Sequence, residues 1–156
     1  MWKTILSTNN IKYFKDVEKQ IIHNCGEKSY QHIFIFHKER DGDRIGHTEI
    51  MTIQELIEKA AELQISLSET QVKQLEQYAQ LLVEWNEKMN LTAITEHGEI
   101  LEKHFYDSIL PLGKGKIFGK VADIGTGAGF PGLVWKIVKP ELDVSLIEPT
   151  GKRCTF

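Results

Sequence analysis

The sequence contains only two cysteines, Cys25 and Cys154, which lie far apart and form no CxxC motif. This scarcity argues against a disulfide framework or a cysteine-rich zinc site, so we expect a reduced, cytoplasmic setting. No apolar run approaches the ~20 residues that a membrane helix needs, and no signal peptide is visible. The 156 residues, 41% hydrophobic and 26% charged, are typical of one modest globular domain, alone or with a smaller appendage.

An excess of positive charge is also absent. The net charge of −3 argues against a generally basic nucleic-acid binder. The charge is unevenly distributed, because residues 51–100 carry three Lys or Arg against nine Asp or Glu, whereas residues 101–156 carry eight against six. The Lys and Arg side chains that could bind a phosphate-rich partner are therefore most numerous, relative to acidic residues, in the C-terminal third. This distribution permits a nucleic-acid substrate without requiring one.

Residues 1–50 show little pattern. The segment HIFIFH, at positions 32–37, predicts a strand, and residues 13–22 predict a short helix. Four of the six histidines fall in residues 1–50, but no pair has the compact spacing of a zinc motif, so we expect no metal site. These residues indicate no function, and we expect the functional protein to start at Met51.

From Met51 onward the sequence indicates capped, amphipathic helices. Thr52 with Glu55, and Ser68 with Gln71, form capping-box patterns at the starts of two helices. In the second helix, apolar residues recur every three to four positions and form one stripe, which we expect to pack against a neighbouring helix or domain. The stripe consists of Val72, Leu75, Tyr78, Ala79, Leu82, Trp85 and Met89.

A third helix is predicted over residues 96–112, and a Gly/Lys-rich linker follows it. Beyond the linker, residues 120–124 predict a buried strand, residues 130–140 a helix and residues 143–148 a second strand. A strand, a glycine loop, a helix and a strand together are the opening of a doubly wound α/β sheet. Two strands do not make such a sheet, so the sequence looks like an N-terminal portion.

The sequence VADIGTGAGFPG, starting at Val121, raises the question of which ligand approaches this backbone so closely. The pattern GxGxxG is present, and Glu148 ends the next strand at about the distance that dinucleotide-binding enzymes require. Two ligands therefore compete, a dinucleotide and S-adenosylmethionine. Asp123, two positions before Gly125, distinguishes between them. A carboxylate there repels a pyrophosphate but suits the α-ammonium group of S-adenosylmethionine, while Glu148 accepts both ribose hydroxyls.

Four blocks of the sequence, in order, closely resemble successive blocks of the RsmG (GidB) family of bacterial 16S ribosomal RNA guanine-N7 methyltransferases. The resemblance covers roughly residues 51–156. It implies a helical cap over residues 51–112 and the first part of a class I, Rossmann-like methyltransferase domain over residues 113–156. The blocks are LLVEWNEKMNLTAI (81–94), KHFYDSILPL (103–112), VADIGTGAGFPGL (121–133) and LIEPTGKRCTF (146–156).

The resemblance also implies a set of cofactor residues. Gly125 matches the first loop glycine, and Phe130 matches the large apolar residue after the loop. Glu148 matches the acid that ends the second strand, although Glu148-Pro149 stands where the family usually has Asp followed by Ser. With the residues of the loop itself, the predicted S-adenosylmethionine site contains Asp123, Gly125, Thr126, Gly127, Gly129, Phe130 and Glu148.

Guanine N7 has a free lone pair and bears no proton, so methyl transfer to it needs alignment and no strong base. We therefore predict no catalytic acid or base, and we interpret His104 and Asp107 as structural or RNA-contacting. Lys152 and Arg153 are the favoured contacts to 16S ribosomal RNA or the small subunit, with weaker candidates among the linker lysines. The weaker candidates are Lys114, Lys116 and Lys120.

Two alternatives to this methyltransferase stay open at this point. The first is a truncated, catalytically inactive helical module that mediates an interaction or contacts RNA. The second is a dinucleotide-dependent oxidoreductase. We expect this chain, as it stands, not to catalyse methyl transfer, and we expect the full-length protein to be a monomer.

Overall fold

The computed structural model describes residues 32–35, 50–114, 117–151 and 153–156. The first two helices begin where the sequence predicts. Helix α2 (Ile53–Glu62) has Thr52 as its N-cap, and helix α3 (Glu69–Met89) has Ser68, each with both hydrogen bonds of a capping box. These caps satisfy the backbone N–H groups that a helix start leaves without intrahelical partners. Both capping-box predictions are confirmed.

The third predicted helix is continuous but not uniform. It consists of α4 (His97–Ile100), a π-helical turn η1 (Leu101–Tyr106), α5 (Asp107–Ile109) and a 3₁₀ turn η2 (Leu110–Lys114). π-Helical turns inside helices are rare and often mark functional sites. Here the π-helical turn contains His104 and Phe105, both buried.

Within the described residues, the sheet has three parallel strands in the order β1-β2-β3. Strands β2 (Lys120–Ile124) and β3 (Asp143–Ile147) are the two predicted ones, and β1 (His32–Ile35) pairs with β2 from His32 opposite Val121 to Ile35 opposite Ile124. The strand predicted in HIFIFH is therefore confirmed. The expectation that only the two later strands form the sheet is wrong, because residues 1–50, in which the sequence indicated no function, supply a parallel partner for β2. A functional start at Met51 stays a prediction.

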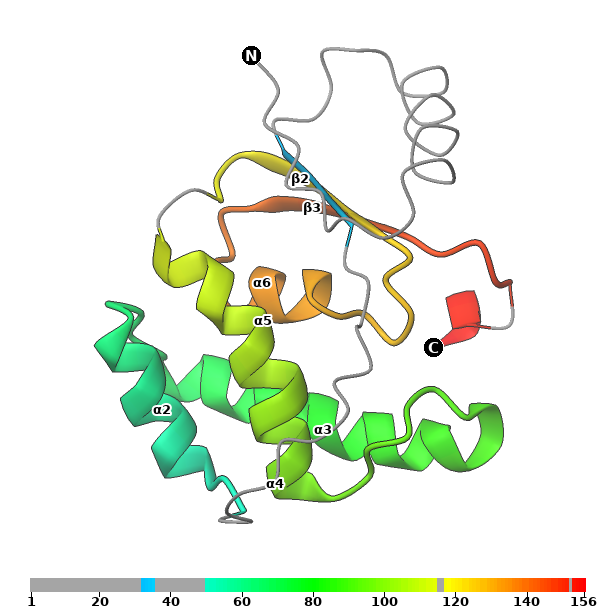
Figure 1. Cartoon of the computed structure of the whole chain (residues 1–156), viewed down its shortest axis with the longest axis horizontal. Helices are drawn as coiled ribbons and strands as arrows, with labels where there is room; N and C mark the ends of the chain where they lie inside the picture. Colours follow the sequence, from blue (N-terminus) through cyan, green and yellow to red (C-terminus); the bar gives the residue numbers. More distant parts are fainter. Residues whose placement is uncertain (1–31, 36–49, 115–116, 152) are drawn as a thin grey trace, which may run out of the picture.

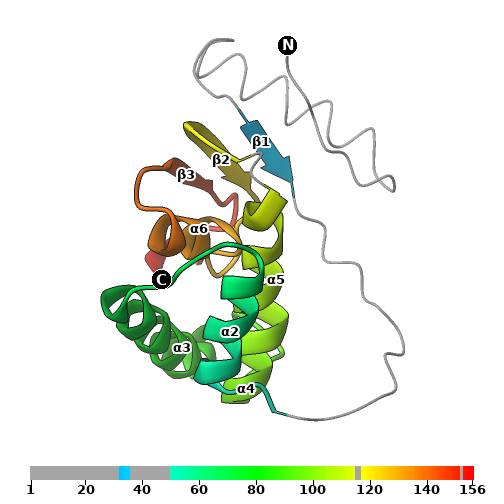
Figure 2. The ribbon, with the colours of Figure 1, turned by 90° about the vertical axis from the view of Figure 1, so that its left-hand side faces the viewer.

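Helix α6 (Gly132–Val138) connects β2 to β3 and lies between the sheet and the other helices (Figures 1 and 2). The short 3₁₀ helix η3 (Arg153–Thr155) follows β3. Strands and helices in this arrangement form an α/β fold, as predicted. None of the helices in the described ranges is long and apolar enough to cross a bilayer.

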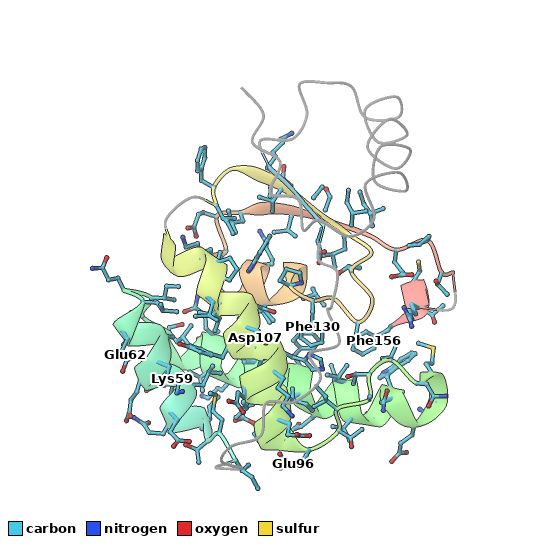
Figure 3. All side chains as sticks on the ribbon, in the orientation of Figure 1. Lys59, Glu62, Glu96, Asp107, Phe130 and Phe156 are labelled. Carbon is cyan, nitrogen blue, oxygen red and sulfur yellow. The ribbon has the colours of Figure 1, made fainter. Side chains whose placement is uncertain are left out.

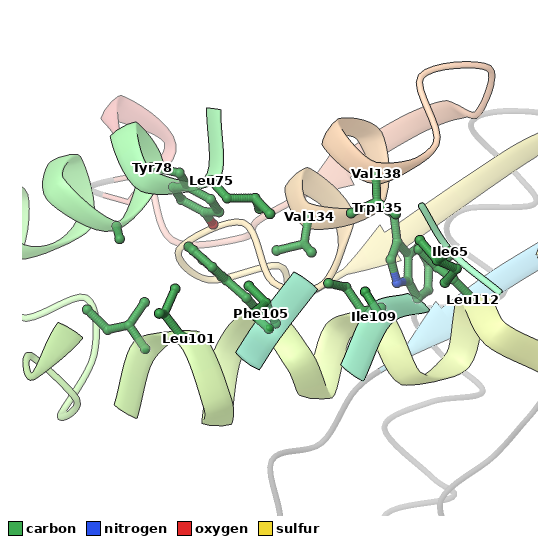
Figure 4. Close-up of a cluster of buried hydrophobic side chains, with 14 of the residues drawn as sticks. Ile65, Leu75, Tyr78, Leu101, Phe105, Ile109, Leu112, Val134, Trp135 and Val138 are labelled. Carbon is green, nitrogen blue, oxygen red and sulfur yellow. The ribbon is translucent and has the colours of Figure 1, made fainter. Parts of the chain in front are cut away.

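The apolar stripe of α3 packs as predicted, with its central residues buried and its ends partly buried. Together with side chains of α2, α4–α5 and α6 it forms one continuous core between the helical layer and the sheet (Figure 4). Each such side chain contributes on the order of 1.5–3 kcal/mol by leaving water. The largest fully buried side chains are Trp135, Phe105, Leu56, Leu75, Leu82, Ile100, Leu101 and Ile109.

Polar contacts also join the helical layer to α6. The side-chain amide of Gln71 donates to the carbonyl oxygens of Ile137 and Val138, both at 2.9 Å, and so caps the C-terminal end of α6. The indole N–H of Trp135 donates to the carbonyl oxygen of Ser108 at 2.7 Å. Helix α6 and the loop before it are thereby fixed relative to the predicted cap.

Candidate cofactor-binding site

The glycine-rich loop connects β2 to α6. The backbone N–H of Gly125 donates to the carbonyl oxygen of Ile147 at 2.7 Å, which fastens the loop to the end of β3. The N–H groups of Gly129 and Phe130 donate back to the carbonyl oxygen of Thr126, at 2.9 and 3.0 Å. The loop therefore lies at the carboxyl ends of two neighbouring parallel strands, the edge at which open α/β sheets bind ligands.

Asp123 lies beneath this loop and is 1% exposed. Its Oδ2 atom accepts hydrogen bonds from the hydroxyl of Thr126 at 2.7 Å and from the backbone N–H of Gly132 at 2.8 Å. Its Oδ1 atom is buried and has no hydrogen-bond partner among the described residues. One oxygen thus holds the loop together, and the other is buried without a hydrogen-bond partner among the described residues.

The charge of Asp123 is costly where it lies. Burial raises the pKa of its carboxyl to about 6, although the hydrogen bonds from Thr126 and Gly132 lower it. The negative charge of Glu148 is a smaller cause that also contributes to this raised pKa. A cationic ligand group would relieve this cost, because an opposite charge favours the ionised carboxylate.

Glu148, at the end of β3, is half-buried and faces the same loop. Its Oε2 atom accepts from the N–H of Gly127 at 2.9 Å, and its Oε1 atom accepts from the N–H of Thr150 at 2.8 Å. Burial raises the pKa of Glu148, but these hydrogen bonds and the charge of Arg153 lower it more, so its pKa lies below the ordinary value. Glu148 is therefore a carboxylate with lone pairs left for further donors.

Two loop glycines face open space. Gly125 and Gly127 have φ angles of +75° and +61°, and a β-carbon at either position would meet no atom within 4 Å. These φ values favour glycine, and the open side leaves the backbone accessible to a ligand. Gly132 differs, because a β-carbon there would lie 2.3 Å from Cδ2 of Leu146 and 2.8 Å from Oδ2 of Asp123.

A cavity of about 220 Å³ opens beside the loop. Of the predicted site residues, Thr126, Gly127, Gly129, Glu148 and Arg153 line it. Asp123 does not line it but accepts a hydrogen bond from Thr126, which does, so both carboxylates contact the loop. The sequence did not reveal five further lining residues, since their side chains meet only through the fold: Ala128, Leu133, Leu146, Cys154 and Phe156.

Phe130 does not line this cavity. Its ring stacks on His104, with centroids 4.5 Å apart and planes at 13°, and on Tyr78, with centroids 5.2 Å apart. Figure 3 shows Phe130 and Phe156 pointing toward the helical layer. The predicted contact between Phe130 and a cofactor stays a prediction, and its ring has a packing role in this structure.

His104 is buried, and its Nε2 atom lies 2.9 Å from the hydroxyl oxygen of Thr92. Through this contact and its stacking on Phe130, His104 packs between the helical layer and the residues that follow the loop. Asp107 begins α5, one turn further along the same helix (Figure 3).

The predicted RNA contacts are only partly described. Arg153 is exposed on η3 and lines the cavity. Nζ of Lys120 lies 3.7 Å from Oδ2 of Asp143 in an exposed ion pair, which adds little stability. Lys152 and Lys116 lie outside the described residues, and so does the side chain of Lys114. Within the described residues, no group of three or more His, Cys, Asp and Glu could hold a metal ion.

Residues 71–156 match the family described as rRNA small subunit methyltransferase G (GidB). The chain belongs to this family. The matched range contains the whole loop, both carboxylates and most of α3. The residues that match the family therefore include those of the site described above.

Curated relatives carry the name "Ribosomal RNA small subunit methyltransferase G". The protein of Lactococcus lactis subsp. lactis (strain IL1403) is 52% identical over 109 residues, which are 68% of this chain and 46% of the relative. The protein of Streptococcus sanguinis (strain SK36) has the same identity and coverage. That of Streptococcus pneumoniae serotype 19F (strain G54) is 54% identical over 99 residues, 62% of this chain and 42% of the relative. The chain thus spans about half the length of the curated relatives it matches.

Proposed function

We propose that this chain carries the cofactor-binding part of an S-adenosylmethionine-dependent methyltransferase that modifies guanine N7 in the 16S RNA of the small ribosomal subunit. The observation that carries the proposal is the pair of carboxylates, Asp123 and Glu148, at the ends of neighbouring strands on either side of an open glycine loop. In this proposal residues 51–112 form a helical cap, and residues 113–156 form the first part of a Rossmann-like methyltransferase domain.

The residues present fit the cofactor. S-adenosylmethionine supplies a methyl group on a positively charged sulfur, which is activated for transfer. The unpaired Oδ1 of Asp123 can accept from the α-ammonium group of its methionyl end, directly or through water. Glu148 keeps its charge and presents acceptors to ribose hydroxyls, and the open sides of Gly125 and Gly127 admit the ligand to the backbone.

A dinucleotide fits this site less well. A pyrophosphate at the loop would lie close to two carboxylates, one of them buried in a medium that screens charge poorly. The loop offers no arginine or lysine of its own to offset that repulsion. The charge at the loop therefore favours a cation-bearing cofactor.

Methylation of guanine N7 requires no proton transfer by the protein. Guanine N7 uses its own lone pair, so the chain has to hold the base in line with the methyl group and keep water away. The exposed Arg153 at the cavity is the described residue best placed for an RNA phosphate. We therefore propose no general acid or base in this chain.

Two measurements test the proposal. Calorimetry of the purified chain with S-adenosylmethionine, S-adenosylhomocysteine and NAD should show binding of the first two and none of the third. Tighter binding of NAD would contradict the cofactor assignment. Labelled S-adenosylmethionine with small subunits that lack the modification, followed by nuclease digestion, then tests for 7-methylguanosine. Label in another nucleoside would contradict the N7 assignment alone.

A further inference from the structure

Tyr78, on α3, makes a contact that cofactor chemistry alone does not explain. Its side chain is buried, and its hydroxyl donates to the carbonyl oxygen of Ala128, in the middle of the glycine loop, at 2.5 Å. Figure 4 shows the hydroxyl directed toward this loop. The two residues are 50 positions apart in the sequence, so the helical layer reaches the loop through this hydrogen bond.

The ring of Tyr78 is held on several sides. Its centroid lies 5.4 Å from that of Phe105 on η1, 5.2 Å from that of Phe130 after the loop, and 6.3 Å from that of Phe156. Aromatic contacts of this kind add to the stabilisation from burial and restrict how the ring moves. The hydroxyl is therefore aimed at one place, the carbonyl of Ala128.

The same hydroxyl occupies the space beside Gly129. A β-carbon at Gly129 would lie 2.8 Å from the Tyr78 oxygen and 2.4 Å from Cδ1 of Leu133. Burial raises the pKa of Tyr78 well above its ordinary value, and the charge of Asp123 raises it further. The phenol consequently stays protonated and remains a hydrogen-bond donor to the loop.

We infer that Tyr78 is a positioning residue that holds Ala128 and Gly129 in the shape that receives the cofactor. Both loop residues line the cavity, whereas Tyr78 does not, so it acts on the ligand only through them. The helical cap thereby becomes part of the cofactor site. The inference rests on the proposed function for its effect on S-adenosylmethionine, but its effect on the loop is measured without any ligand.

The test uses the complete chain and Tyr78→Phe, which keeps the ring and its stacking but removes the donor. Amide hydrogen exchange is followed at Gly129 and Phe130, and amides of α2 serve as an internal reference. We expect loop exchange to rise about fivefold relative to α2, as for the loss of one ordinary hydrogen bond, and the affinity for S-adenosylmethionine to fall by a similar factor. Tyr106→Phe is the matched control, since that ring lies beneath Lys59, 5.3 Å from its Nζ.

The outcomes separate the two ideas. Faster exchange confined to the loop together with weaker cofactor binding supports the inference. If the wild-type chain binds no S-adenosylmethionine and the loop still opens in Tyr78→Phe, the positioning of the loop stands and the proposed cofactor fails. Unchanged loop exchange, an equal rise in loop and α2, or a loosened loop with unchanged affinity overturns the inference.

Discussion

The backbone N–H of Gly127 donates to Oε2 of Glu148 at 2.9 Å, and this hydrogen bond joins the centre of the glycine loop to the end of β3. Glu148 therefore closes the site on one side and still presents carboxylate lone pairs to the cavity. Tyr78 holds the same loop from the helical side through Ala128. The cavity thus depends on contacts from both the sheet and the helices.

Glu148→Gln should weaken the binding of S-adenosylmethionine at least tenfold, since hydrogen bonds to a charged group contribute ~1.5–3 kcal/mol. A single amide oxygen cannot serve the N–H groups of Gly127 and Thr150 and the ribose hydroxyls as two carboxylate oxygens do. Calorimetry at pH 7.5 measures the change. Glu141→Gln, at an exposed position before β3, is the control and should bind normally. Equal affinities in the two variants would contradict the role given to Glu148.

The stability of the protein should depend on pH through Asp123. Its pKa is raised from 3.8 to about 6 in the folded state, so between pH 4 and 6 the folded chain holds a proton that the unfolded chain has released. The contribution of Asp123 to stability is therefore lost as pH rises through this window, by up to ~3 kcal/mol. Urea unfolding of wild type and Asp123→Asn should show that the free energy of unfolding of the variant rises relative to that of wild type from pH 4 to pH 7.

The difference between the two proteins isolates Asp123, because the other carboxylates are common to both. A constant difference in free energy of unfolding over this pH range would mean that Asp123 titrates normally.

Asp123→Asn should also lose affinity for S-adenosylmethionine, by ~1.5–3 kcal/mol, because it removes the charge opposite the ammonium group. The variant is therefore expected to gain stability relative to wild type between pH 4 and neutral pH, and yet to bind the cofactor less well. A variant that merely damages the fold would lose both. Calorimetry at pH 7.5, with sinefungin or S-adenosylhomocysteine as second ligands, measures the loss. Unchanged affinity would place the ammonium group elsewhere.

Local patterns in the sequence predicted much of this fold. The caps at Thr52 and Ser68 and the stripe of α3 depend on neighbours three or four positions apart, and the structure confirms them. The pairing of β1 with β2 depends on residues about 90 positions apart, and no local pattern encodes such a register. For the same reason the hydrogen bond from Tyr78 to Ala128 could not be read from the sequence, where Tyr78 is one apolar residue of a stripe.

The candidate site was predicted in its residue types but not in its internal contacts. The sequence placed Asp123 opposite a ligand, whereas the structure shows that one of its oxygens already binds Thr126 and Gly132. The predicted site included Gly125, Gly127 and Gly129 without distinguishing them, and no cofactor contact was predicted for Gly132. In the structure Gly127 faces open space, and Gly132 is packed against Leu146 and Asp123. Which glycine faces the cavity is set by strand and helix packing, which sequence spacing does not contain.

This difference between glycines gives the last prediction. Gly127→Val introduces strain at a φ of +61°, ~1–2 kcal/mol, and directs a branched side chain into open space beside the cavity, so affinity for S-adenosylmethionine should fall at least as far as stability. Gly132→Ala places a β-carbon 2.3 Å from Leu146, and such overpacking should lower the free energy of unfolding by ~1–3 kcal/mol. Its effect on binding should come only through Asp123. Urea unfolding and calorimetry on both variants measure the two effects separately. A Gly127→Val chain that binds with wild-type affinity would show that the cofactor does not lie over this loop.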